Sequence, residues 1–321
     1  MRYSSSWKQH QAKENRKSIF SVFLTIVLLF AIASGFSKGF SLTSKIKSGK
    51  WDGASPFTIA MGGPKPAVFI YQPDSKEIAV LSVSGETLYE GGNSSNPLEK
   101  ISDASAQKTA ETLSKTFGAK IDNYINIPDT LDEGKSKEMF KNFASLTTPV
   151  SILIRGKDDE IKSTNITRLD SLRLWWKVKG LGVKDVQFTD LALLVEEIID
   201  ASGQKVLGVD TLSLNRQIAQ YLQDSKLTGE NINITIKNGT GVPGAARLAA
   251  SFATSVGAKV VDVKDEKAVN NKTSIVANEK SFTSSYLAKM FNCDINVAQN
   301  DTGIGEITLD LGQDFAEYWF K

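Results

Sequence analysis

Apolar and polar positions alternate most clearly near the C-terminus. Residues 232–237 alternate isoleucine with polar side chains, which is the two-residue period of a half-buried β-strand. The glycine-rich segment 238–244 follows, and residues 245–256 then place alanine, leucine and phenylalanine at helical spacing. Gly257 is suited to end a helix, and residues 258–263 are again strand-like. This pattern predicts a strand, a sharp turn, a helix and a second strand.

The remaining C-terminal residues continue this order of elements. The pattern predicts a helix at 281–291 and strands at 273–277, 295–297 and 307–311. The order βαββαββ predicts a small open sheet with both helices on one face, in a C-terminal α/β domain that spans residues 231–321. The polar segment 224–230 is predicted to be the linker before this domain.

Residues 58–223 are predicted to form a separate α/β domain. The apolar runs 67–71 and 78–83 flank a turn-forming segment, so they predict a hairpin. One predicted helix contains Leu172, Trp175 and Trp176, which are expected to face inward, although paired tryptophans also suit stacking on a sugar ring. Further strands are predicted at 121–127, 150–154 and 186–191, and helices at 107–117, 168–178 and 213–222.

The N-terminal part of the chain has a different pattern. Residues 1–17 carry five basic side chains and one acidic one, and the next nineteen residues, Ser18–Phe36, carry no charge. About twenty helical residues span the ~30 Å hydrocarbon core of a bilayer, so this run is predicted to be a single transmembrane helix after a cytoplasmic tail. Residues 37–57 would be a juxtamembrane spacer with Trp51 at the interface. The alternative is a cleaved signal peptide, because Ala31-Ile32-Ala33 is an A-x-A site.

Both alternatives place the later domains outside the cytoplasm. With the membrane-spanning alternative, the predicted fold class is α/β (α+β), with an N-terminal transmembrane helix before two α/β domains. The predicted location is then the cell membrane, with the N-terminus in the cytoplasm and both domains extracytoplasmic.

Composition excludes several classes of function. The net charge is +2, and no basic run with interleaved aromatic residues lies beyond the N-terminus, which argues against a nucleic-acid partner. His10 is the only histidine and Cys293 the only cysteine, so the exported part cannot hold a Ser-His-Asp triad, a Cys-His pair or a histidine-rich zinc site. Cys293 is expected to be a small core residue. No metal site is predicted.

The glycine-rich turn also invites comparison with phosphate-binding loops. It lacks both the GxGxxG spacing and the Lys-Ser/Thr ending of a P-loop, so its glycines are expected to serve backbone geometry. The residues that define the turn are Asn238, Gly239, Thr240, Gly241, Pro243 and Gly244.

The strand, NGTGVPG turn, helix and GAKVVDV strand resemble the C-terminal domain of the LytR-CpsA-Psr family of cell-envelope proteins. Two earlier segments, Ala67–Tyr89 and Ala106–Ile127, are similar to that family's catalytic domain. The resemblance implies a phosphotransferase that moves glycopolymers from a polyprenyl-diphosphate carrier to peptidoglycan. Such chemistry needs acids that hold a divalent cation and arginines that neutralise the diphosphate.

This sequence departs from the family at those positions. The family's Arg-Asp pair falls on Gly85-Glu86, and an expected acid falls near Pro66-Ala67, where there is no carboxylate. The resemblance therefore implies a degenerate domain with no assigned catalytic residue. Glu86 remains a candidate ligand-binding residue, as do three arginines that could rebuild an anion site but are otherwise solvated surface residues: Arg155, Arg168 and Arg173.

Two hypotheses follow for the exported part. The first is a non-catalytic, membrane-anchored protein without a cofactor that binds peptidoglycan, another cell-wall glycopolymer or an envelope protein, with Ser18–Phe36 in the lipid bilayer. The second is an active glycopolymer transferase with a rewired site and Mg²⁺. A transcriptional regulator fits poorly, because no helix-turn-helix with a basic face is predicted.

Overall fold

The structure is a computed structural model in which the chain divides into two units, residues 1–50 and 51–321. The predicted transmembrane span and the predicted strand 150–154 lie outside the described residues. The described residues are 49–85, 88–90, 98–127, 130–145, 147–149, 164–191, 195–199, 205–209, 211–266, 268–298 and 306–320.

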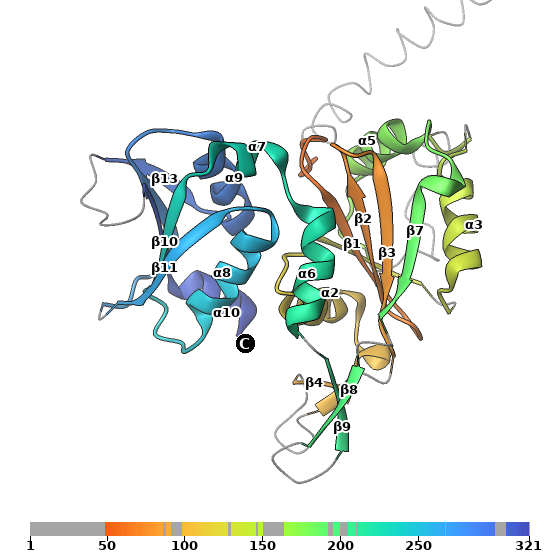
Figure 1. Cartoon of the computed structure of the whole chain (residues 1–321), viewed down its shortest axis with the longest axis horizontal. Coiled ribbons are helices and arrows are strands. Elements are labelled where there is room, and N and C mark those ends of the chain that lie inside the picture. Colours follow the sequence, from red (N-terminus) through yellow and green to blue (C-terminus); the bar gives the residue numbers. More distant parts are fainter. Residues whose placement is uncertain are drawn as a thin grey trace, which may run out of the picture. The chain divides into compact units, whose positions relative to one another are not determined.

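The first sheet has five strands in the order β6-β1-β2-β3-β7 (Figure 1). The middle pair, β2 and β3, forms the predicted hairpin, with Gln72 opposite Glu77 next to its turn. β1 runs antiparallel to β2 and parallel to β6, while β3 runs parallel to β7. The strands are β1 (Phe57–Gly62), β2 (Ala67–Gln72), β3 (Glu77–Ser82), β6 (Asn123–Asn126) and β7 (Val186–Asp190).

Apolar side chains are buried on both faces of this sheet. Helices α2 and α6 pack on one face, in the core that contains Ile70, and α3 and α5 pack on the other face, in the core that contains Tyr71. Because neighbouring positions enter opposite cores, β2 and β3 are almost continuous apolar runs. These helices are α2 (Ala106–Phe117), α3 (Glu133–Phe143), α5 (Arg168–Val178) and α6 (Thr211–Leu222).

The second sheet also has five strands, in the order β11-β10-β14-β12-β13. β10 is parallel to β11 and β14, and β12 is antiparallel to β14 and parallel to β13. Ile236, Leu309 and Ile275 lie side by side on one face and share one apolar core with α8, α9 and α10. The elements are β10 (Asn233–Asn238), α8 (Ala245–Ser255), β11 (Lys259–Asp265), β12 (Ser274–Ala277), α9 (Phe282–Phe291), β13 (Asp294–Val297), β14 (Ile307–Leu311) and α10 (Gln313–Trp319).

The segment predicted to be a polar linker is instead a short helix, α7 (Ser225–Glu230). The Asp224 carboxylate caps it by accepting hydrogen bonds from the backbone N–H groups of Lys226 and Leu227 at 2.9 and 3.2 Å. Leu227 is buried in the core of the second sheet, while the other five residues of α7 are exposed, so one side chain anchors this segment. The smaller elements are β4 (Leu88–Glu90), β5 (Leu98–Lys100), β8 (Val195–Ile199), β9 (Lys205–Val209) and the 3₁₀ turns η1 (Ile101–Asp103) and η3 (Val183–Asp185).

The fold class needs one correction. The structure supports a mixed α/β protein with two five-stranded sheets, but not the transmembrane helix that the prediction included. Among the described residues, no helix has the length and apolar character needed to cross a bilayer. The predicted span was inferred from the length of the run, its lack of charge and the basic segment before it, and residues 18–36 lie outside the described part.

Two local predictions were also wrong, and one helix was not predicted. Trp51 is not an interfacial residue of a spacer: it is buried against Phe57 and Tyr71, beside strand β1, which the sequence pattern did not predict. Trp176 does not face inward but is 65% exposed, with the Lys179 ammonium 3.2 Å from its ring centre. The C-terminal helix α10 was missed, although Trp319 is buried in the core of the second sheet.

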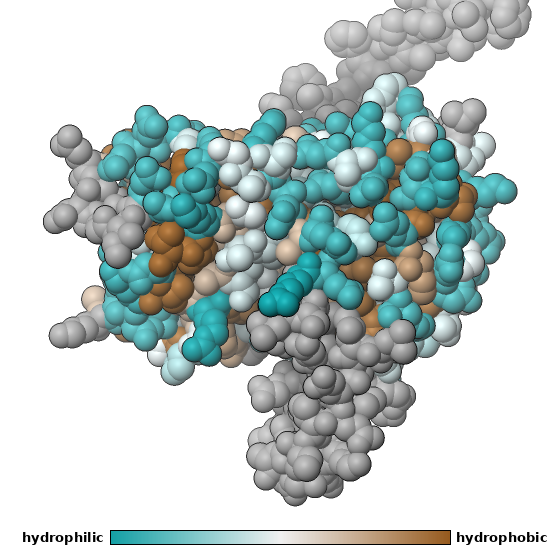
Figure 2. Space-filling view, viewed as in Figure 1, coloured by the Kyte–Doolittle hydropathy of each residue, from teal (hydrophilic) through white to brown (hydrophobic). Residues whose placement is uncertain are grey.

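The described surface is mostly hydrophilic in the view of Figure 2, with apolar side chains gathered over part of each sheet region. In the second sheet, β11 is an edge strand, and its Val261 and Val263 are 38% and 46% exposed. Its lysines and aspartates interrupt this apolar row, which is a common way to discourage pairing between edge strands.

We predict that Gly239→Ala lowers the free energy of unfolding by about 1–3 kcal/mol. A β-carbon at Gly239 would overlap the side-chain amide of Asn270 and lie 2.7 Å from the carbonyl oxygen of Leu311. Gly229→Ala is the matched control, because a β-carbon there has no neighbour within 4 Å and alanine favours helix α7. Urea unfolding should show the loss only for Gly239→Ala, and equal stability of the two variants would contradict it.

Candidate functional site

The first candidate site lies where the family resemblance places catalytic residues, just after strand β3. At Gly85 a β-carbon would overlap the carbonyl oxygen of Pro64 and lie 3.2 Å from the β-carbon of Ser102. Two backbone hydrogen bonds hold these segments together, from Ser102 N–H to the Gly85 carbonyl at 3.2 Å and from Val83 N–H to the Pro66 carbonyl at 2.8 Å. Backbone therefore fills the space that a side chain at residue 85 would need.

The charged groups at the ends of the neighbouring strands are paired with each other. Lys65 Nζ lies 2.6 Å from Asp190 Oδ2, with side chains 25% and 40% exposed. The same ammonium lies 6.0 Å from the centre of the Phe188 ring. The lysine charge is thus already balanced by a carboxylate, which weakens its attraction for a diphosphate.

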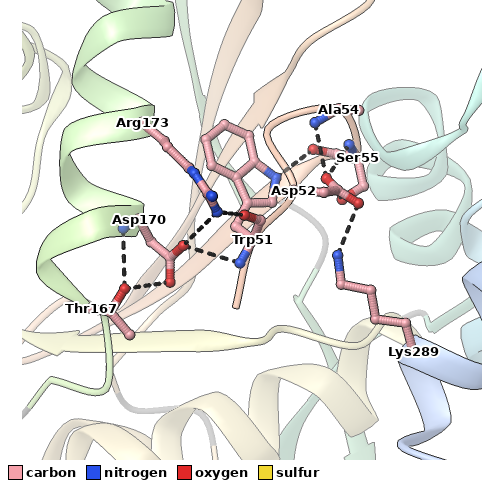
Figure 3. A network of polar contacts seen from close by, with 8 residues as sticks. All are labelled: Trp51, Asp52, Ala54, Ser55, Thr167, Asp170, Arg173 and Lys289. Atoms are coloured by element: carbon pink, nitrogen blue, oxygen red, sulfur yellow. Dashed lines mark hydrogen bonds and ion pairs between the residues drawn. The ribbon is translucent and has the colours of Figure 1, made fainter. Parts of the chain in front are cut away.

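Two of the three predicted arginines, Arg168 and Arg173, lie on helix α5. Arg168 is the exposed first residue of α5. Arg173, one turn further along α5, donates a hydrogen bond to the carbonyl oxygen of Trp51 and lies 3.8 Å from Asp170 Oδ1 (Figure 3). Arg155 and Glu86 lie outside the described residues. The contacts of Arg173 fix the chain at Trp51.

A buried carboxylate, Asp170, is the centre of this network. It is 1% exposed and accepts hydrogen bonds from Trp51 N–H at 3.0 Å and from the Thr167 hydroxyl at 2.7 Å. Thr167 also caps α5, since its hydroxyl accepts a hydrogen bond from Asp170 N–H. A buried carboxylate with these partners stabilises the fold only while they remain, because an unpaired buried charge is costly.

Asp52, which follows Trp51 in the chain, connects this network to helix α9 (Figure 3). Its Oδ1 accepts hydrogen bonds from Ala54 N–H, Ser55 N–H and the Ser55 hydroxyl at 2.9–3.0 Å. Its Oδ2 lies 2.9 Å from Lys289 Nζ. Burial alone would raise the pKa of Asp52, but the bonds from Lys289, Ser55 and Ala54 outweigh burial and hold this pKa well below its ordinary value.

The NGTGVPG turn satisfies its own polar groups. The Asn238 side chain donates to the Val242 carbonyl and to Asp265, and it accepts a 2.7 Å bond from the Thr240 hydroxyl. Thr240 in turn accepts from Val242 N–H at 2.9 Å. Gly241 and Gly244 have positive φ angles of 75° and 84°, which other residues adopt only with strain. These contacts shape the turn and leave its side chains engaged with the chain itself.

The cavities in the part of the chain that the structure describes include two with mostly polar linings. The larger, about 460 Å³, lies beside the end of α9 and the start of β13. Two of its charged groups are already in use: Lys289 pairs with Asp52, and Asp314 Oδ1 accepts bonds from the N–H and hydroxyl of Thr273. Cys293 lines this cavity as well, and burial, together with Asp314 and Asp294, raises the pKa of its thiol to about 12, so the thiolate is disfavoured.

The second cavity, about 140 Å³, lies between residues of α2, the start of β6 and α10. The sequence pattern does not predict this cavity, because its residues come from separate segments and the pattern did not predict α10. The one sequence signal is the aromatic C-terminal run, in which Phe315 and Trp319 have helical spacing.

Among the described residues, no group of three acidic, histidine or cysteine side chains is arranged as a metal site.

Residues 231–315 match the family model described as LytR cell envelope-related transcriptional attenuator. This match confirms the resemblance that the NGTGVPG turn and its flanking elements predicted for the C-terminal part. No curated protein matches the chain.

Several solved structures are similar to about half of the chain at low identity. TagV from B. subtilis is 13% identical, with 53% of this chain and 98% of that chain covered and a TM-score of 0.35. Protein gbs0355 from Streptococcus agalactiae is 13% identical, with 52% and 88% covered and a TM-score of 0.38. The LytR-CPS2A-psr family protein YwtF (TagT), solved with bound octaprenyl pyrophosphate lipid, is 11% identical, with 54% and 92% covered and a TM-score of 0.35. Scores this low carry no conclusion about the present chain.

We predict that Asp52→Asn is less stable than the wild type at pH 7 and that the difference shrinks below about pH 4. The folded pKa of Asp52 is depressed, so its contribution is fully present above the unfolded pKa and is lost as the pH falls toward the folded value. Urea unfolding at pH 7 and pH 3 measures this difference. Glu138→Gln removes an exposed acid and should match the wild type at both pH values. A difference that does not change with pH would contradict the assignment.

Proposed function

We propose that this chain is an extracytoplasmic cell-envelope protein that binds wall polymer without transferring it. The observation that carries the proposal is the match of residues 231–315 to a cell envelope-related family model. These residues form a complete sheet with its own apolar core, so the matched part is a structural unit suited to binding. A peptidoglycan strand or another wall glycopolymer is the partner we infer, and an envelope protein is the alternative.

The geometry after β3 supports the non-catalytic part of the proposal. A transferase of the resembled kind needs cationic groups at the diphosphate, and each lost charge-assisted contact costs about 1.5–3 kcal/mol. Gly85 has no room for a side chain, and Lys65 is paired with Asp190. Arg173 is engaged by Trp51 and Asp170. We therefore propose that binding requires no cofactor, and Mg²⁺ would matter only for a transferase.

The extracytoplasmic location is proposed from the N-terminal charge pattern. A basic segment before nineteen uncharged residues is typical of chains that are exported. The proposed partner, a wall polymer, lies on the outer side of the membrane and requires this location.

We predict that protease added to spheroplasts degrades the part of the chain beyond residue 51. The reason is that a basic segment followed by a long uncharged run is typical of chains that are exported. An antibody against the C-terminus follows the loss, and a cytoplasmic protein serves as the protected control. Full protection of the C-terminal part would contradict an extracytoplasmic location.

We predict that the purified full-length protein sediments with isolated cell-wall sacculi and does not bind vesicles containing polyprenyl diphosphate. Binding is measured with and without Mg²⁺, because a transferase would need the cation to hold the diphosphate. The sacculus result should be the same in both conditions.

The opposite outcome is equally specific. Mg²⁺-dependent vesicle binding that is lost in Arg168→Ala or Arg173→Ala, but kept in Arg247→Ala, would favour the transferase. Arg247 is an exposed arginine on α8 and is the matched control. Thermal melts of the three variants separate lost binding from lost folding, since Arg173 holds Trp51.

A further inference from the structure

The 140 Å³ cavity brings together residues from four separate segments of the unit 51–321. Gln107 and Glu111 come from α2, Asp122 and Tyr124 from the start of β6, and Tyr318 from α10. Asn165, which precedes α5, completes the polar lining. Two phenol rings, two carboxylates and two amides thus meet in one small space.

On one side of this cavity the ring of Tyr318 is exposed to solvent and is supported by a buried neighbour. Tyr318 is 58% exposed, and its ring packs edge-on against Trp319, with ring centres 4.9 Å apart. Trp319 itself is only 6% exposed, so it is a fixed support. Burial, together with Glu111, Asp122 and Tyr124, raises the pKa of Tyr318, which keeps its hydroxyl protonated and able to donate.

The polar side of the cavity is balanced in charge. Glu111 accepts a 3.1 Å bond from the Gln107 amide and lies 3.5 Å from Lys108 Nζ. Asp122 lies 3.0 Å from Lys120 Nζ. Each carboxylate keeps further lone pairs that can accept hydrogen bonds from a ligand. Because a lysine accompanies each acid, the cavity suits a neutral ligand rich in hydroxyl groups better than a cation.

Asn165 positions the backbone of the segment that carries Asp122 and Tyr124. Its Oδ1 accepts from Tyr124 N–H at 2.9 Å, and its Nδ2 donates to the Asp122 carbonyl at 2.8 Å. These two bonds fix the backbone that carries the Asp122 and Tyr124 side chains. The lining is therefore preorganised, which lowers the entropic cost of binding.

We propose that this cavity binds one sugar residue of a wall polysaccharide, with Tyr318 against the C–H face of the ring and Glu111 and Asp122 accepting from its hydroxyls. The assignment rests on the proposed wall-binding function and names the part of the polymer that is recognised. An exposed aromatic ring beside planar hydrogen-bonding groups matches a sugar, which has one apolar face and a polar rim.

The volume limits what can enter. About 140 Å³ is the space of four to five water molecules at ~30 Å³ each, so the cavity takes the edge of one ring and not an oligosaccharide. The rest of the polymer remains in solvent along the exposed Tyr318. This arrangement allows recognition of a sugar within a chain as well as at its end.

The test compares variants of the full-length protein for binding to sacculi and to the disaccharide that muramidase releases from peptidoglycan. Tyr318→Ala should weaken binding about tenfold or more, because the stacking surface is removed. Glu111→Gln should weaken it several-fold through loss of a charged acceptor. Tyr318→Phe keeps the ring and should remain closer to the wild type. Val297→Ala is the control, since it removes another exposed apolar side chain, on β13, outside the cavity.

The outcomes separate this proposal from the function on which it rests. Sacculus binding by the wild type that is unchanged in Tyr318→Ala and Glu111→Gln would overturn the sugar site and leave wall binding in place. Absence of sacculus binding by the wild type would overturn both. Thermal melts of each variant confirm that folding is intact, because Tyr318 lies next to buried Trp319.

A second arm identifies the source of the sugar. Hydrofluoric acid removes polymers that are attached to peptidoglycan through phosphodiesters. Tyr318-dependent binding that persists after this treatment, and that the disaccharide inhibits, assigns the sugar to the glycan strand. Tyr318-dependent binding that disappears after treatment assigns it to the attached polymer, and the cavity remains the site in both cases.

Discussion

The burial of both faces of the first sheet limits where functional side chains can lie in residues 51–223. Alternate side chains of β2 and β3 enter opposite cores, so these strands have no free face for polar chemistry. Functional groups are therefore confined to strand ends, helix surfaces and connecting segments. At the end after β3, backbone from Pro64 approaches Gly85 so closely that no side chain fits.

The polar network at Trp51 shows how the start of this unit is fixed. Asp170 is almost completely buried, and its carboxylate holds Trp51 N–H while Arg173 holds the Trp51 carbonyl. One residue later, Asp52 reaches Lys289 on α9. Arg173, which the sequence offered as a candidate for an anion site, instead holds the backbone at Trp51. The role of Arg173 therefore depends on its neighbours, the buried Asp170 and the Trp51 carbonyl, and not on its charge alone.

The two functional conclusions depend on different parts of the molecule. The cell-envelope assignment comes from the second sheet and its turn, where residues 231–315 match a family model. The proposed sugar site depends on Tyr318 in α10, beyond that match, together with Glu111 in α2. Polymer recognition would then require the first sheet's helix and the C-terminal helix at once. In the proposed site, helix α2 would form one wall and helix α10 the other.

The sequence by itself determined the elements whose residues repeat with a clear period. The β2–β3 hairpin, helices α2, α5 and α8, and strand β10 follow from apolar spacing and from glycines such as Gly118 and Gly257, because these signals are local. Tertiary structure decided what local patterns do not carry. It placed Trp51 inside and Trp176 outside, packed the polar segment after Asp224 as helix α7, and closed Gly85 with Pro64. It also brought Glu111 and Tyr318 to one cavity, since contacts between distant segments depend on how the layers pack and not on the spacing within any one of them.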